Sequence, residues 1–314
     1  MTALLALFLE RLVGYPNALV ARIGHPVMWM GRLIAGLDLR LNIGDRRRQR
    51  GVLALIVLLA VTALATVPLA LALRSIPFGW AVEAILASSL LAQKSLRDAV
   101  CAVIVALSRS LDEGRRAVSH IVGRDPQALD QAGVSRAAIE SLAESTSDGV
   151  IAPLFFLILG GLPGIALYKA VNTADSMIGH KTPRHFEFGW AAARFDDLLN
   201  LIPARLTALL IAGAAFFVKG AHPEAAWSTA LSDAKKHESP NAGWPEAAFA
   251  GALDLKLGGP RSYDGEVVDL PSFGTGRPDL GPADIERALV LYAATLNVTL
   301  AVTALVALLV WRLG

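Results

Sequence analysis

Two long runs without a charged residue most constrain what this chain can fold into. Residues 51–73 comprise 23 positions and residues 288–311 comprise 24, with no Asp, Glu, Lys or Arg in either. About 20 apolar residues are enough for a helix to cross the hydrocarbon core of a bilayer, which is roughly 30 Å thick. Each run therefore predicts a transmembrane helix.

The composition agrees with a membrane protein. Hydrophobic residues make up 54% of the 314 residues and charged residues 18%, whereas soluble domains average about 45–50% and about 25%. The net charge of +2 gives no basic excess of the kind that nucleic-acid binding requires, so we expect no nucleic-acid partner. Cys101 is the single cysteine, which excludes an intramolecular disulfide.

Three further apolar segments are shorter, broken or more polar. Residues 78–92 contain Glu83, residues 150–168 contain several Gly and Pro, and residues 198–218 contain Pro203 and Arg205. Broken segments are tolerated in membranes where they line a cavity enclosed by protein. We therefore expect an all-α polytopic membrane protein, a single membrane-embedded domain over residues 1–314, with re-entrant or broken helices and ordered polar loops.

The segment 150–168 contains Gly160, Gly161, Pro163 and Gly164 near its middle. These residues disfavour helix, so we predict a helical hairpin or re-entrant loop with arms of about ten residues each. Four arginines lie between residues 46 and 50, immediately before the first apolar run. Because basic residues flank membrane spans on the cytoplasmic side, we expect that end of the span, and the functional site, at the cytoplasmic face.

An acidic stripe precedes this broken segment. Ser135 is a candidate N-cap and Gly149 a candidate C-terminal stop for one helix, in which Glu140, Glu144 and Asp148 recur at every fourth position. Like charges at this spacing are destabilising, so the stripe predicts a cation beside it, either Mg²⁺ or a basic side chain. The alternative is a solvated acidic face.

Two further blocks, YKAVNTADSMIGHKTPRH (168–185) and WAAARFDDLLNLIPARL (190–206), combine acids, amides and bases. Carboxylate and amide oxygens suit Mg²⁺, and basic side chains suit phosphate oxygens. The alternative is internal ion pairing, such as Arg194 with Asp197. The candidates in these blocks are Lys169, Asn172, Asp175, Lys181, Arg194, Asp196, Asp197, Asn200 and Arg205.

Several long blocks together resemble the adenosylcobinamide-phosphate synthase family of cobalamin biosynthesis. The matching stretches are HPVMWMGRLI (25–34), GRDPQALDQAGVSRAAIESLAESTSDGVIAPLFF (123–156), GGLPGIALYKAVNTADSMIGHKTPRHFEFGWAAARFDDLLNLIPARLTALL (160–210) and SPNAGWPEAAFAGALDLKLGGPRSYDGE (239–266). These ordered blocks cover most of the chain and are far more specific than a short motif.

The resemblance implies a multi-pass enzyme of the inner membrane. Such an enzyme joins the free propionate of adenosylcobyric acid to 1-amino-2-propanol or its O-phosphate through an amide bond, using ATP and Mg²⁺. It would be an ATP-dependent acid–amine ligase, and a complex with other enzymes of late corrinoid synthesis is a further expectation.

In this interpretation the catalytic acids are Glu144, Asp148, Asp175, Asp196 and Asp197. Candidate magnesium ligands are Glu140, Glu144, Asp148, Asp196 and Asp197. Substrate or phosphate binding falls to Lys169, Asn172, Lys181, Arg194, Asn200 and Arg205, and to Asn241, Glu246, Tyr263 and Asp264 of the fourth block.

Two other interpretations remain open. Paired Asp residues on helices also hold Mg-diphosphate in membrane prenyltransferase-like enzymes. The chain could instead be a corrinoid transporter, with Glu83, Arg205 and the broken segments forming the path.

Overall fold

The computed structural model describes residues 1–122, 126–259, 261–263, 266–268 and 270–313, without the side chains of 17, 261–263, 266–268 and 313. Contacts divide the chain into two compact units, one of residues 1–92 and 152–200 and the other of residues 93–151 and 201–314. The interpretation of residues 1–314 as a single domain stays a prediction.

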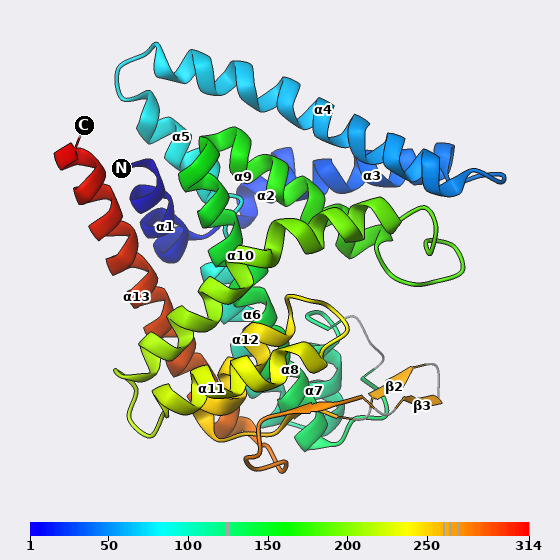
Figure 1. Ribbon diagram of the computed structural model, residues 1–314, viewed down its shortest axis with the longest axis vertical. Helices are drawn as coiled ribbons and strands as arrows, with labels where there is room; N and C mark the ends of the chain where they lie inside the picture. The colour runs from blue at the N-terminus through cyan, green and yellow to red at the C-terminus, as the bar shows by residue number, and fades with distance from the viewer. Residues whose placement is uncertain (123–125, 260, 264–265, 269, 314) are drawn as a thin grey trace. The chain divides into compact units, whose positions relative to one another are not determined.

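The first unit consists of helices. They are α1 (Thr2–Val13), α2 (Asn17–Ile23), α3 (Pro26–Leu41), α4 (Arg47–Arg74), α5 (Gly79–Ser88), α9 (Ala152–Ile178) and the first part of α10 (Trp190–Ala215), up to Asn200 (Figure 1). Its core lies where α3, α4, α9 and α10 meet, and includes Ile34, Leu58, Ala174 and Phe188.

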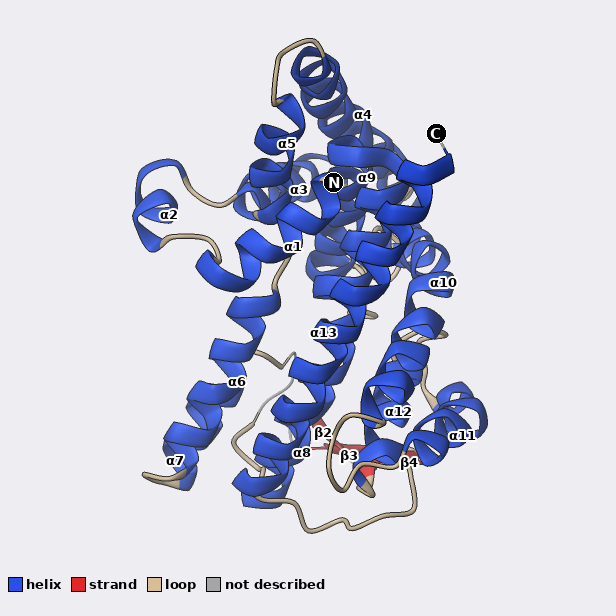
Figure 2. Cartoon of the chain, turned by 90° about the vertical axis from the view of Figure 1, so that its left-hand side faces the viewer, coloured by secondary structure: helices blue, strands red, loops and turns tan. Residues whose placement is uncertain are grey.

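The second unit holds α6 (Gln93–Leu107), α7 (Leu111–Val118), α8 (Gln131–Thr146), the π-helical turn η1 (Ser147–Ile151), the rest of α10, α11 (Pro223–Asp233), the 3₁₀ turn η2 (Ala234–Lys236), α12 (Gly243–Leu253) and α13 (Pro282–Leu313). Its strands are short, as Figure 2 shows. β1 (Leu257–Gly258) pairs antiparallel with β4 (Ser272–Phe273), and β2 (Arg261–Tyr263) pairs antiparallel with β3 (Glu266–Val268).

Among the described residues, four helical runs are long and apolar enough to cross a membrane: 47–74, 131–178, 190–215 and 282–312. The charge-free runs 51–73 and 288–311 lie inside α4 and α13. Several threonine hydroxyl groups in these helices bond within their own helix. Thr62 donates to the carbonyl of Leu58, and Thr299 donates to that of Thr295, so neither needs water. The fold is therefore all-α and polytopic.

Helix α8 differs from its predicted bounds at both ends. Asp130, rather than Ser135, caps its N-terminus, because the Asp130 carboxylate accepts from the backbone N–H of Gly133 at 2.7 Å. Ser135 lies inside the helix and is fully buried. The helix does not stop at Gly149 either, because the π-helical turn η1 accommodates that residue and leads into α9.

Helix α9 is broken at Gly161, within the predicted cluster of Gly and Pro. Gly161 has φ 60° and ψ −151°, a conformation essentially restricted to glycine. The carboxylate of Glu83, on α5, accepts from the backbone N–H of Leu162 at 2.8 Å. This bond satisfies a donor that the break would otherwise leave open at the start of the second arm.

The break folds the two arms of α9 back on each other (Figure 1). The rings of Phe156 and Tyr168 stack with centroids 5.0 Å apart, although a straight helix would separate these positions by about 18 Å along its axis. A methyl group at Gly164 would collide with the carbonyl oxygen of Phe156. The second arm thus begins beside the first rather than continuing from it.

Candidate functional site

A continuous polar network joins α9 to α10 inside the first unit. The Tyr168 hydroxyl donates to Oδ1 of Asn200 at 3.0 Å, and the Asn200 amide donates to Oδ2 of Asp196 at 2.9 Å. From the other side, Lys169 Nζ donates to Asn172 Oδ1 at 3.1 Å, and the Asn172 amide donates to Asp196 Oδ1 at 3.5 Å. The carboxylate of Asp196 is thus the common acceptor.

Burial differs along this network. Tyr168 and Asn200 are each 1% exposed, and Asp196 is 8% exposed. Asp196 lies six positions after the start of α10, about 9 Å along the helix, whereas Asn200 lies about 15 Å along it. The acid is therefore nearer the helix end than the neutral Tyr168–Asn200 pair.

Two more predicted acids lie near Asp196. Asp175 interacts electrostatically with Asp196 and with Asp197, and His180 acts on the charge of Asp175. Asp197 faces Arg194 at 3.9 Å, with the side chain of Arg194 exposed and that of Asp197 partly exposed. The ion pair that the sequence offered as an alternative is thus present, in a loose form that contributes little when exposed.

The sequence analysis therefore grouped residues that the structure brings together: Lys169, Asn172, Asp175, Asp196, Asp197 and Asn200, with Arg194 beside Asp197 and with Lys181 exposed on the loop that follows α9. It missed Tyr168 as a member. Tyr168 opens the quoted block, but a tyrosine in an apolar stretch carries no signal of a hydrogen bond.

The side chains around Asp196 can be compared with the ligands that Mg²⁺ takes in proteins. Among the described residues, no group of three or more His, Cys, Asp and Glu side chains lies close enough to hold a metal ion. Both oxygens of Asp196 already accept from amides. The set therefore fits Mg²⁺ bound by one or two carboxylates together with substrate phosphates, which is its usual mode, and does not fit an all-protein cage.

The ends of four helices meet on the side of the first unit where Asp175 and Asp196 lie. The Arg48 guanidinium lies 3.8 Å from the centroid of the Trp190 ring, which joins the starts of α4 and α10. Arg184, in the loop between α9 and α10, forms an ion pair with Asp38 near the end of α3. The arginine-rich stretch therefore lies on the same side as the loop 179–189.

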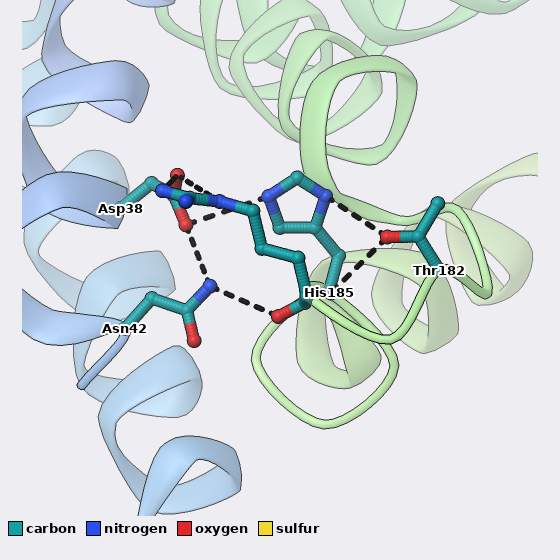
Figure 3. Close-up of polar contacts among 5 residues, drawn as sticks. Asp38, Asn42, Thr182 and His185 are labelled. Atoms are coloured by element: carbon teal, nitrogen blue, oxygen red, sulfur yellow. Dashed lines mark hydrogen bonds and ion pairs between the residues drawn. The ribbon is translucent and has the colours of Figure 1, made fainter. Parts of the chain in front are cut away.

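The loop 179–189 is held by side chains that sequence reasoning did not select. Figure 3 shows Asp38 and Asn42 facing Thr182 and His185 across the gap between α3 and the loop. Asp38 is a lone acid in an apolar helix, and its partner Arg184 lies 146 positions away. A single sequence carries no signal for such a pairing.

The acidic stripe lies in the second unit and has mixed surroundings. Glu140 is buried and accepts from the backbone N–H of Gly258 at 2.6 Å, so it supports β1. Glu144 is exposed and Asp148 is half-buried. The stripe is therefore not a uniformly solvated face, and the shared site of Glu144 and Asp148 with Asp196 stays a prediction.

The fourth block forms a second polar cluster, in the second unit. Glu246 is 1% exposed, with Oε1 at 3.6 Å from Nε2 of His237, and Asn241 is also buried. The Arg205 guanidinium lies 4.7 Å from the centroid of the Trp244 ring and donates to the carbonyl of Leu201. These contacts connect Arg205 to the Asn241–Glu246 block. The side chain of Tyr263 and all of Asp264 lie outside the described residues.

An apolar cavity of about 450 Å³ lies in the first unit between α3, α4, α5 and α9. Its lining includes Trp29, Leu58, Leu69 and Leu162, with hydroxyls from Thr62, Thr66 and Ser89. Both threonine hydroxyls are bonded within α4. The cavity therefore suits an apolar group, and no Lys, Arg or His is among the described residues that line it.

Comparison with known proteins supplies the family. Residues 3–292 match the family described as CobD/Cbib protein. The chain is 50% identical over 311 residues to "Cobalamin biosynthesis protein CobD" of Rhodobacter capsulatus, covering 97% of this chain and 96% of the relative. It is 48% identical to the protein of that name from Rhizobium meliloti (strain 1021), covering 96% of this chain and 94% of the relative. It is 47% identical to the protein of that name from Brucella suis biovar 1 (strain 1330), covering 93% of this chain and 92% of the relative. No solved structure matches. The chain therefore belongs to the CobD/Cbib family of cobalamin biosynthesis proteins.

Proposed function

We propose that this protein joins the free propionate of adenosylcobyric acid to 1-amino-2-propanol or its O-phosphate, in an ATP- and Mg²⁺-dependent amide synthesis. The observation that carries the proposal is the network around Asp196, where carboxylates, amides and a lysine from α9 and α10 meet. The names of the relatives supply the corrinoid pathway.

The chemistry follows from the poor reactivity of a carboxylate toward an amine. The propionate oxygen attacks the γ-phosphorus of ATP, ADP leaves, and an acyl phosphate forms. The amine nitrogen then attacks the acyl carbon, inorganic phosphate leaves, and the amide remains. The amine loses one proton in this step, and a carboxylate is a suitable acceptor.

The residues of the first unit suit these steps in different ways. Asp175 and Asp197 lie close to Asp196 and are the candidates for magnesium ligation and for proton transfer. Lys169 is the candidate for holding phosphate oxygens, with Arg194 and Lys181 nearer the surface. When bound, Mg²⁺ would offset negative charge on the transferring phosphoryl group.

The residues of the second unit have supporting roles in this proposal. Glu144 and Asp148 are further candidates for magnesium ligation and proton transfer, and Glu140 supports strand β1 by accepting from the backbone N–H of Gly258. Arg205, Asn241 and Glu246 are the candidates for corrinoid or aminoalcohol contacts. Their buried polar groups and the Trp244 ring provide both hydrogen bonds and an apolar face.

We further propose that the site faces the cytoplasm from the inner membrane. The loop 179–189 lies at the same end of the first unit as the arginines that precede α4, and such arginines mark the cytoplasmic side. ATP is available on that side. A complex with other enzymes of late corrinoid synthesis would deliver the corrinoid there. The family assignment favours neither the prenyltransferase nor the transporter interpretation.

The experiment that tests this function uses the detergent-purified protein. It is incubated with adenosylcobyric acid, ATP and Mg²⁺ and with the free or the phosphorylated aminoalcohol, and the products are identified by mass spectrometry. We expect a mass that corresponds to loss of water between corrinoid and amine, with one ADP formed per amide. If the protein reconstituted into vesicles takes up corrinoid without ADP formation, the result would contradict the proposal and favour transport, whereas binding of lipid diphosphates alone would favour the prenyltransferase.

A further inference from the structure

The carboxylate of Asp38 is the centre of a second polar network in the first unit. It is 9% exposed, near the end of α3. Arg184 donates to its Oδ2 through Nη2 at 2.6 Å and through Nε at 3.2 Å, and Asn42 donates to its Oδ1 at 2.8 Å. His185 Nε2 lies 3.5 Å from the same Oδ1. Two nitrogens of the Arg184 guanidinium thus donate to one oxygen of a buried carboxylate, and charge-assisted hydrogen bonds of this kind are stronger than those between neutral groups.

The network contacts the backbone of the loop 179–189 as well as its side chains. The amide of Asn42 also donates to the carbonyl oxygen of Arg184 at 3.0 Å. Within the loop, the backbone N–H of His185 donates to the Thr182 hydroxyl at 3.2 Å, and Figure 3 shows Asn42 and Asp38 directed at this turn. The position of residues 182–185 is therefore fixed relative to α3.

The same loop joins the two helices that carry the acids. Asp175 lies three positions before the end of α9, and Asp196 lies six positions after the start of α10. His180, at the beginning of the loop, acts on the charge of Asp175. The loop is tightly seated at both ends, because a methyl group at Gly179 would collide with Asp175 and one at Gly189 with the carbonyl of Ile178. Movement of the loop would thus change the positions of its basic side chains relative to the acids.

We propose that Asp38 is a positioning residue of the site: it anchors the loop 179–189 through Arg184 and Asn42, so that the loop's basic side chains meet a phosphate-bearing substrate beside Asp175. The inference rests on the proposed function for its substrate. It assigns Arg184 to anchoring the loop rather than to binding phosphate, and leaves that task to His180 and Lys181.

The kinetic test is a double-mutant cycle with Asp38→Asn, Arg184→Gln and the double variant. We expect each single variant to raise KM for ATP or for the aminoalcohol phosphate about tenfold, with kcat changed much less, and the double variant to resemble either single one. A merely structural role would reduce the amount of active enzyme and lower the apparent kcat without moving KM. Asp38→Glu, which keeps the charge, is expected to restore part of the affinity.

A second measurement does not depend on activity. Trypsin cleaves after Lys181 and Arg184, and release of the loop is expected to accelerate cleavage after Lys181 in the Asp38→Asn protein. Asp112→Asn is the matched control, because Asp112 pairs with Arg115 at 2.9 Å but is 79% exposed in its side chain. Cleavage and KM are expected to match the wild type in that variant.

The outcomes separate the inference from the proposed function. If the wild type makes no amide, the proposed function fails and the trypsin comparison alone decides whether Asp38 anchors the loop. If the wild type makes amide but Asp38→Asn matches it in KM and in cleavage, the inference is overturned. Additive effects of Asp38→Asn and Arg184→Gln would also overturn it, since they would show that the two residues act independently.

Discussion

The ring of Phe156 stacks on the ring of Tyr168, twelve positions later in the same helix, with 5.0 Å between the centroids. This contact is possible only because α9 reverses at Gly161. The reversal places Tyr168, and the network that it belongs to, beside the first arm of α9. In a continuous helix Tyr168 would lie far from that arm.

Gly161→Ala is expected to destabilise the protein by about 1–3 kcal/mol, because alanine is strained at the φ of 60° found there. Its neighbour provides the control. A methyl group at Gly160 meets nothing within 4 Å, so Gly160→Ala is expected to leave the stability unchanged or slightly raised. Thermal unfolding of the two variants in detergent measures the difference, and equal melting temperatures would contradict the strained turn.

Asp196→Asn is expected to reduce kcat/KM for amide formation by at least about a hundredfold, because it removes the carboxylate at the centre of the network, and the loss of one catalytic polar group has effects of this size. Both oxygens of Asp196 accept from the side-chain amides of Asn172 and Asn200. An asparagine at position 196 would therefore place its own NH₂ group against the NH₂ group of one of these two residues. Product formation is followed by mass spectrometry at saturating Mg²⁺. Turnover close to that of the wild type would remove Asp196 from the site.

Asp148→Asn tests whether the acidic stripe of the second unit takes part in the reaction. We expect it to abolish amide formation while expression and membrane insertion stay normal, because the amide keeps the shape and loses the charge. Asp197→Asn is expected to behave in the same way. If Asp148→Asn retains activity and Asp197→Asn does not, the acidic stripe does not take part in the reaction.

The topology is tested by cysteine labelling in a Cys101→Ala background. Glu144→Cys and Lys181→Cys place single thiols at exposed positions on either side of the broken segment. We expect an impermeant reagent to label both from the cytoplasmic side, because the reversal at Gly161 returns the chain toward its starting face. Labelling of the two thiols from opposite sides would disprove the re-entrant topology and with it the single site.

The stability of the second unit is expected to depend on pH through Asp233. Burial raises the pKa of this carboxyl, but hydrogen bonds from Lys236, from the N–H of Gly274 and from Ser232 outweigh it and hold the pKa below 3.8. The folded state therefore gains stability above pH 3.8 and loses it as the pH falls through the folded pKa. Unfolding measured from pH 7 to pH 3 should show Asp233→Asn less stable at neutral pH, with the gap narrowing in acid. A gap independent of pH would exclude this carboxylate as its source.

The sequence predicted the long apolar helices and the break near Gly161 because both depend on local composition. It misplaced the start of α8 because Asp130 and Ser135 are equally good caps by residue type. Only packing shows that Ser135 is buried. The sequence-based prediction also misplaced the end of α8, because Gly149 lies within the π-helical turn at residues 147–151 and does not end the helical run.

The candidate site was predictable to the level of residue types. Acids and amides spaced by three and four on two blocks indicate one polar face on each helix, and the structure pairs those faces through Asn172 and Asp196. The role of Asp38 was not predictable, since its ion pair with Arg184 joins positions 146 residues apart. Such contacts follow from packing of whole helices and leave no trace in local spacing.

The network around Asp196 has a fixed direction of donation. Tyr168 donates to Asn200 and Lys169 donates to Asn172, and both amides then donate to Asp196. Neither amide can rotate by half a turn without placing two donors, or two acceptors, against each other. Asparagine and aspartate are therefore not interchangeable at position 200, despite their equal size, because a second carboxylate would face the first. The network thus has a carboxylate end at Asp196, nearer the start of α10, and a hydroxyl end at Tyr168, deeper in the helix pair.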